Sequence, residues 1–164
     1  TPRFVRPSQK PSQFGLMLRE LENLAPSGGA CLSRLLAHAS RLIHRRSLIL
    51  LLSDLLEPSD EIATGLKQLR FLGHEVIIFQ VLDRDEVEFP FEENAIFEDL
   101  ETGQRRSVLP GGSTRAGYLE RFEQFMAQYR ELFQALEIPF CTVSTNESPA
   151  NALSVFLEQR RRLF

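Results

Sequence analysis

The sequence predicts an α/β fold built on a doubly wound, mainly parallel sheet. Two apolar runs, at residues 48–52 and 75–82, are nearly unbroken, which is typical of strands that are covered on both faces. Segments with helical spacing of apolar residues separate these runs from each other and from a third run at residues 138–143. Because strands that alternate with helices pair in parallel through right-handed crossovers, this alternation predicts the fold class.

Two helices are predicted before the first strand. The first covers residues 14–24 and stops at the Pro-Ser-Gly-Gly sequence of residues 26–29. The second is amphipathic, because apolar residues recur at i, i+3, i+4, i+7 and i+11 between Leu32 and Ile43. The run from Leu48 to Leu52 then predicts the first strand, which ends on Ser53 and Asp54.

The same alternation continues through the middle of the chain. A helix is predicted from Pro58 to Gly73, because acidic residues follow the proline and glycine is typical of a helix end. A second strand follows at residues 75–82. The change of pattern after it predicts an inserted β-hairpin that joins residues 95–100 to residues 104–109 through a Thr-Gly turn.

Two further helices enclose the third strand. The longest helix carries an apolar stripe that runs from Tyr118 to Leu136. Pro139, near the start of the third strand, favours an edge position for that strand. The last helix opens at residues 146–149, and its predicted inward-facing residues are Ala152, Leu153, Phe156 and Leu157.

Composition limits the classes of function. The chain has 164 residues, 43% of them hydrophobic and 25% charged, and a net charge of −3, which disfavours nucleic acid as a partner. No apolar run approaches the ~18 residues of a membrane span. Two cysteines, Cys31 and Cys141, make no disulfide framework, so a reduced cytoplasmic location is expected.

The start of the sequence predicts a fragment of a longer protein. It begins on Thr1 and continues through three prolines and several basic residues. We therefore interpret residues 1–12 as a linker-like leading segment and residues 13–164 as the α/β domain.

Polar residues follow all three predicted strands and mark a candidate site. Ser53 and Asp54 end the first strand, Asp83 ends the second, and Ser-Thr-Asn at residues 144–146 ends the third. The carboxyl ends of parallel strands meet at one edge, where α/β sheets bind ligands. The loop of Ser27, Gly28 and Gly29 precedes a helix and could join this site. The alternative is that these residues form turns and helix caps.

Several segments together resemble a known bacterial family. They are Pro26 to Leu32, Arg46 to Leu56, Leu69 to Val76, Phe89-Pro-Phe91 and the Phe-Glu-Asp-Leu-Glu-Thr-Gly sequence of residues 97–103. The sequence resembles the carboxyl-terminal half of the domain of unknown function 58 family. That resemblance implies a von Willebrand factor A-like, Rossmann-like fold and an association with MoxR-type AAA+ ATPases.

The resemblance also implies a divalent-cation site that is incomplete here. In von Willebrand A domains the ion is held by an Asp-x-Ser-x-Ser loop, a Thr in a Gly-Gly-Thr-like loop and an Asp at a strand end. Asp54 matches the last of these, whereas Ala30 stands in place of the Thr and Ser27 has the wrong spacing. No Asp-x-Ser-x-Ser occurs in the sequence. We therefore expect no cofactor, and at most weak binding of magnesium, since that ion requires several oxygen ligands.

Two functions follow as hypotheses. The first is a non-enzymatic protein-interaction module that works with an AAA+ ATPase. The second is a magnesium-dependent phosphoryl-transfer or hydrolase domain that uses Asp54 and Asp83. If the central first strand of the resembled fold is missing, the strand at residues 48–52 becomes an unpaired edge. We then expect either a homodimer that pairs through this edge or another segment that covers it.

Overall fold

A computed structural model describes residues 5–6, 8–25, 31–91, 95–98, 103–108 and 112–161 of the protein. In chain order, the described helices and strands are α1 (Ser12–Glu22), α2 (Leu32–Leu42), β1 (Leu48–Ser53), α3 (Ser59–Phe71), β2 (Glu75–Leu82), α4 (Arg84–Glu88), β3 (Ala95–Glu98), β4 (Arg105–Val108), α5 (Gly112–Ala135), β5 (Phe140–Ser144) and α6 (Pro149–Arg161).

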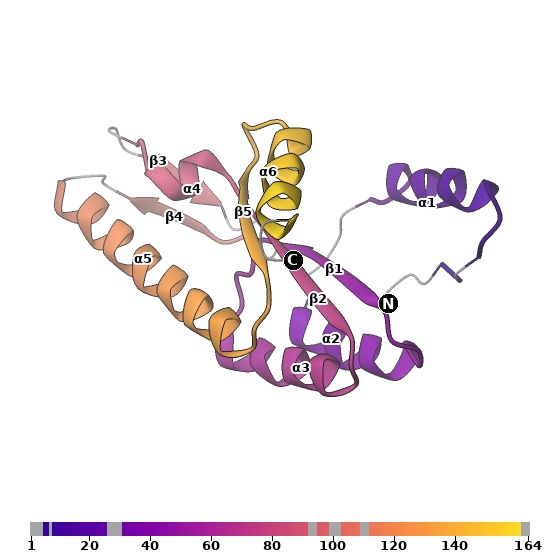
Figure 1. Cartoon of the computed structure of the whole chain (residues 1–164). Helices are drawn as coiled ribbons and strands as arrows, with labels where there is room; N and C mark the ends of the chain where they lie inside the picture. The colour runs from indigo at the N-terminus through magenta and orange to yellow at the C-terminus, as the bar shows by residue number, and fades with distance from the viewer. Residues whose placement is uncertain are drawn as a thin grey trace.

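Three strands form a parallel sheet in the order β1-β2-β5, with β2 in the centre (Figure 1). Leu50 of β1 lies beside Ile77 of β2, and Val81 of β2 lies beside Val143 of β5. The strands β3 and β4 form a separate antiparallel hairpin. The predicted alternation, the parallel pairing, the inserted hairpin and the edge position of the third strand are therefore confirmed.

The ends of α3 show how the sequence sets a boundary. Asp60 and Glu61 lie in its first turn, where acidic side chains interact favourably with the helix dipole. At the other end, Gly73 has a φ of +81°, a left-handed conformation that glycine adopts without steric cost. This turn lets the N–H of His74 donate to the carbonyl of Leu69 at 3.1 Å, and the chain enters β2 directly.

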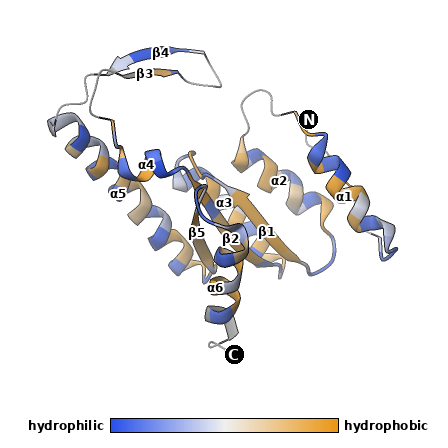
Figure 2. Ribbon diagram, turned by 90° about the horizontal axis from the view of Figure 1, so that it is seen from above, coloured by the Kyte–Doolittle hydropathy of each residue, from blue (hydrophilic) through white to orange (hydrophobic). Residues whose placement is uncertain are grey.

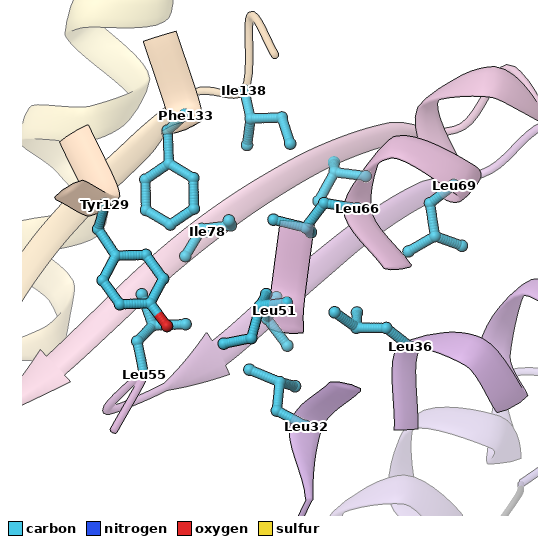
Figure 3. Close-up of a cluster of buried hydrophobic side chains, with 12 residues drawn as sticks. Leu32, Leu36, Leu51, Leu55, Leu66, Leu69, Ile78, Tyr129, Phe133 and Ile138 are labelled. Atoms are coloured by element: carbon cyan, nitrogen blue, oxygen red, sulfur yellow. The ribbon is translucent and has the colours of Figure 1, made fainter. Parts of the chain in front are cut away.

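One face of the sheet carries the hydrophobic core. Figure 3 shows Leu51 and Ile78 of the sheet among leucines of α2 and α3 and the rings of α5. The helices α2, α3 and α5 therefore form the layer on this face. The buried members of this core are Leu32, Leu36, Leu51, Leu55, Ile62, Leu66, Leu69, Val76, Ile78, Tyr129, Phe133 and Ile138.

The opposite face is covered only in part by the described residues. The buried Phe156 of α6 packs on Phe79 of β2, with the ring centroids 5.1 Å apart. On this side of β1, however, Leu48, Leu50 and Leu52 are 52, 54 and 68% exposed. The expectation that this strand is covered on both faces is therefore wrong, because α6 lies over β2 and β5 and leaves β1 open.

The prediction for the inner side of the last helix is also wrong in part. Phe156 is buried and Ala152 is partly buried, but Leu153 and Leu157 are about half exposed. The apolar residues of this helix form two stripes. The narrow three-stranded sheet contacts only the stripe that carries Phe156.

Aromatic rings join the hairpin to α5. Phe89 stacks on Tyr118 of α5 with centroids 4.5 Å apart and on Phe97 of β3 with centroids 5.8 Å apart. Arg115 of α5 donates to the carbonyls of Glu88 (2.8 Å) and Phe89 (3.2 Å), which fixes the end of α4. The short helix α4 was not predicted from the sequence. Among the described helices, none has the length and apolar character needed to cross a membrane.

Candidate functional site

The carboxyl ends of β2 and β5 meet at one edge of the sheet. The hydroxyl of Thr145 donates to Oδ2 of Asp83 at 2.8 Å, and the N–H of Thr145 donates to the carbonyl of Leu82 at 3.0 Å. The structure therefore brings together two of the three predicted strand ends by direct hydrogen bonds.

Asp83 also forms the N-cap of α4. Its carboxylate accepts from the N–H of Asp85 at 2.9 Å, and the carboxylate of Glu86 accepts from the N–H of Asp83 at 2.9 Å. The bond from Asp83 to Glu86 is one half of a capping box, and the other half is a bond from the N–H of Glu86 to the side chain of Asp83. The bond from Asp85, followed by that from Thr145, lowers the pKa of Asp83. Its two carboxylate oxygens thus have structural partners, as the capping alternative predicted.

Ser53 and Asp54 shape the turn that follows β1. The hydroxyl oxygen of Ser53 accepts from the N–H of Leu55 at 3.1 Å, and Asp54 accepts from the N–H of Leu56 at 3.4 Å. Leu55 has a φ of 61° and is fully buried, so this turn places an apolar side chain in the core. Across the described parts of the chain, no group of three or more His, Cys, Asp or Glu residues could hold a metal ion.

The loop of Ser27, Gly28 and Gly29 lies outside the described residues, and Ala30 lies there too. The first described residue after it, Cys31, places its thiol 3.1 Å from the hydroxyl of Ser33. Hydrogen bonds with Ser33 and then Arg34 lower the pKa of this thiol. The expected contribution of this loop to a binding site therefore stays a prediction.

Glu57, which follows β1, binds both the start of α2 and a residue of α5, and this role was not predicted from the sequence. Its carboxylate accepts from the N–H of Leu32 and from the N–H of Ser33 (3.2 Å), so it caps α2 from a distant loop. Its carbonyl accepts from the hydroxyl of Tyr129 at 2.6 Å. Burial and then the charge of Glu57 raise the pKa of Tyr129. Glu57 thus joins α2 and α5 across the end of β1, a contact between distant residues that no local pattern indicates.

We expect Glu57→Ala to lower the free energy of unfolding by about 1–2 kcal/mol, because it leaves N–H groups at the start of α2 without their acceptor. Glu57→Gln keeps an acceptor oxygen and should cost less. Urea unfolding followed by circular dichroism measures both. Glu123→Ala is the control, because it removes an exposed ion pair with Arg130 and should cost less than about 1 kcal/mol. Equal losses in Glu57→Ala and the control would contradict the capping role.

A second candidate site is the apolar corner, which we define as Leu48, Leu50 and Leu52 of β1 with Leu153 and Leu157 of α6. Figure 1 shows α6 running back antiparallel to β5, and Figure 2 shows β1 as a hydrophobic ribbon. Because Phe156 faces the sheet, the right-handed turn of α6 places residues 153 and 157 on its side nearest β1. The exposed leucines of strand and helix therefore lie on the same side of the sheet, those of α6 on the side of the helix that faces β1.

Comparison with known proteins gives one match. The sequence model of a family described as "Protein of unknown function DUF58" matches residues 2–128. No curated protein and no solved structure matches the chain.

Proposed function

We propose that the chain, which belongs to the DUF58 family of proteins of unknown function, is a protein-interaction module without enzymatic activity. The apolar corner is the observation that carries this proposal. Five leucines, each about half exposed or more, lie on one side of the sheet. A gathering of exposed large apolar side chains is typical of a docking site for another polypeptide.

The use of the strand-end residues supports the non-enzymatic part of the proposal. Asp83 is bonded to Asp85 and Thr145, and Ser53 and Asp54 bond to the turn after β1. These bonds stabilise local structure at the edge where an α/β enzyme would place its reacting groups. For this reason a magnesium-dependent phosphoryl-transfer or hydrolase domain is the second candidate function.

We propose a MoxR-type AAA+ ATPase as the protein partner and the cytoplasm as the location. The support for the partner is the resemblance to a von Willebrand A-like family associated with such ATPases. The parallel sheet and the position of Asp54 at the end of β1 are compatible with that fold. On this proposal the chain binds no nucleic acid.

Calorimetry with a purified MoxR-type ATPase from the same organism tests the proposal. We expect saturable binding that Leu50→Lys weakens at least tenfold, because a charge in the apolar corner would have to be desolvated. Phe71→Lys is the matched control, since Phe71 is an exposed apolar residue at the end of α3, outside the apolar corner. Lack of binding, or equal weakening by both variants, would contradict the proposal. So would magnesium-dependent phosphatase activity that Asp54→Ala abolishes.

A further inference from the structure

The helix α1 is amphipathic and has no buried residue in the structure. Its apolar stripe consists of Phe14, Met17, Leu18 and Leu21, spaced at i, i+3, i+4 and i+7. All four side chains are exposed, Phe14 by 69% and Leu21 by 62%. Figure 1 shows α1 standing apart from the sheet and its helices. Among the described residues, therefore, neither the apolar stripe of α1 nor the apolar corner packs against another element.

We propose that α1 of one copy docks in the apolar corner of a second copy, and that the exchange is reciprocal. The corner lies over β1 and beside α6, on the side of the sheet where α6 is the only helix among the described residues that packs on the strands. A helix beside α6 would complete the second layer over β1, as α/β folds require. The stripe on α1 would then bury the exposed leucines, while Arg19 and Glu20 lie away from the stripe and stay in water.

The occupant is a second copy for two reasons. The separation of α1 from its own sheet is the geometry of an exchanged arm, and reciprocal exchange closes a two-fold dimer without open surfaces. Nine residues, 23–31, join α1 to α2, and a chain of that length spans up to about 30 Å. This reach lets α1 cross to the uncovered side of a neighbouring sheet.

Light scattering on the full chain gives the first test. We expect the wild type to have twice the mass of one chain, and Leu21→Lys in α1 and Leu50→Lys in the corner each to give a monomer. Phe71→Lys should remain a dimer. The decisive sample is an equal mixture of the two monomeric variants. One has an intact corner and the other an intact α1, so the mixture should form a one-to-one dimer that is held by one of the two docking contacts and is weaker than the wild-type dimer.

The outcomes separate the other arrangements. If Leu21→Lys still forms a dimer while Leu50→Lys does not, the two copies pair through the edge of β1, and the proposal is overturned. A monomeric wild type, or a mixture that fails to associate, would also overturn it. Circular dichroism establishes that each variant is folded.

A tryptophan probe reports on α1 directly, since the sequence contains no tryptophan. In Met17→Trp we expect a blue-shifted emission that returns to the solvent-exposed value on dilution. A blue shift that persists in the diluted monomer would indicate docking of α1 in its own corner, and it would overturn the exchange.

This inference rests on the proposed interaction role of the apolar corner, and it names the first occupant. An ATPase that binds the corner would have to displace α1. Leu21→Lys should therefore bind the ATPase more tightly than the wild type. Dimer formation without ATPase binding would defeat only the proposed partner, whereas ATPase binding by a monomeric wild type would defeat only the exchange.

Discussion

Replacing Phe133 by alanine is expected to lower the free energy of unfolding by about 3–5 kcal/mol. Phe133 is fully buried and lies between two other rings, with its centroid 5.4 Å from Tyr129 and 5.1 Å from Phe140 of β5. It therefore joins α5 to the edge of the sheet inside the core (Figure 3). Removing the ring loses apolar burial and leaves a cavity that the surrounding helices and strands cannot fully close.

Urea unfolding at neutral pH, followed by circular dichroism, gives the measurement. Phe71→Ala is the control, because Phe71 is 90% exposed and its removal should change stability by less than about 0.5 kcal/mol. A loss below about 1.5 kcal/mol in Phe133→Ala would mean that α5 does not pack on the sheet as described. The same result would remove the support for Tyr129 as a partner of Glu57.

The elements that the sequence predicts well are those whose signal is local. The strand β2 has the predicted bounds, Glu75–Leu82, because a continuous apolar run is a strong signal and Gly73 ends the preceding helix. The hairpin follows from a turn sequence between two short extended runs. The short helix α4 was missed because its capping box depends on the contact between Asp83 and Glu86 rather than on an apolar period.

Coverage of the sheet could not be predicted, because it depends on which elements lie side by side. The run from Leu48 to Leu52 predicts a buried strand, but α6 is centred on β2 and β5 through Phe156 and Phe79. Periodicity alone likewise gives two apolar stripes on α6 and does not say which one meets the sheet. The apolar corner is the physical result of both mismatches.

The candidate polar site divides in the same way. The rule for parallel strands correctly places Asp83 near Thr145, since both follow strands that are neighbours in the sheet. It does not reveal that Asp83 caps α4. The carboxylate of Glu57 accepts from the N–H of Leu32, which lies 25 residues earlier in the chain. No local pattern around Glu57 indicates this contact. Such contacts follow from tertiary packing alone.

Gly65→Val is expected to lower the free energy of unfolding by about 2–3 kcal/mol. Gly65 lies in α3 directly against Leu36 of α2. A Cβ added there would be 2.6 Å from Cβ of Leu36, an atom that cannot move without α2. Leu36 is itself 3% exposed and part of the core. The larger side chain would therefore push the two helices apart.

Alanine at two glycines isolates this effect from helix propensity. In a helix interior alanine is favoured over glycine by about 1 kcal/mol. At Gly117 in α5 an added Cβ meets no atom within 4 Å, so Gly117→Ala should raise stability by up to about that amount. Gly65→Ala should instead lower it, because the clash with Leu36 outweighs the gain. Urea unfolding of the two variants should therefore give changes in the free energy of unfolding that have opposite signs. A stabilised Gly65→Ala would show that α2 and α3 are farther apart than described. The start of α2, which Glu57 caps, would then also lie farther from α3.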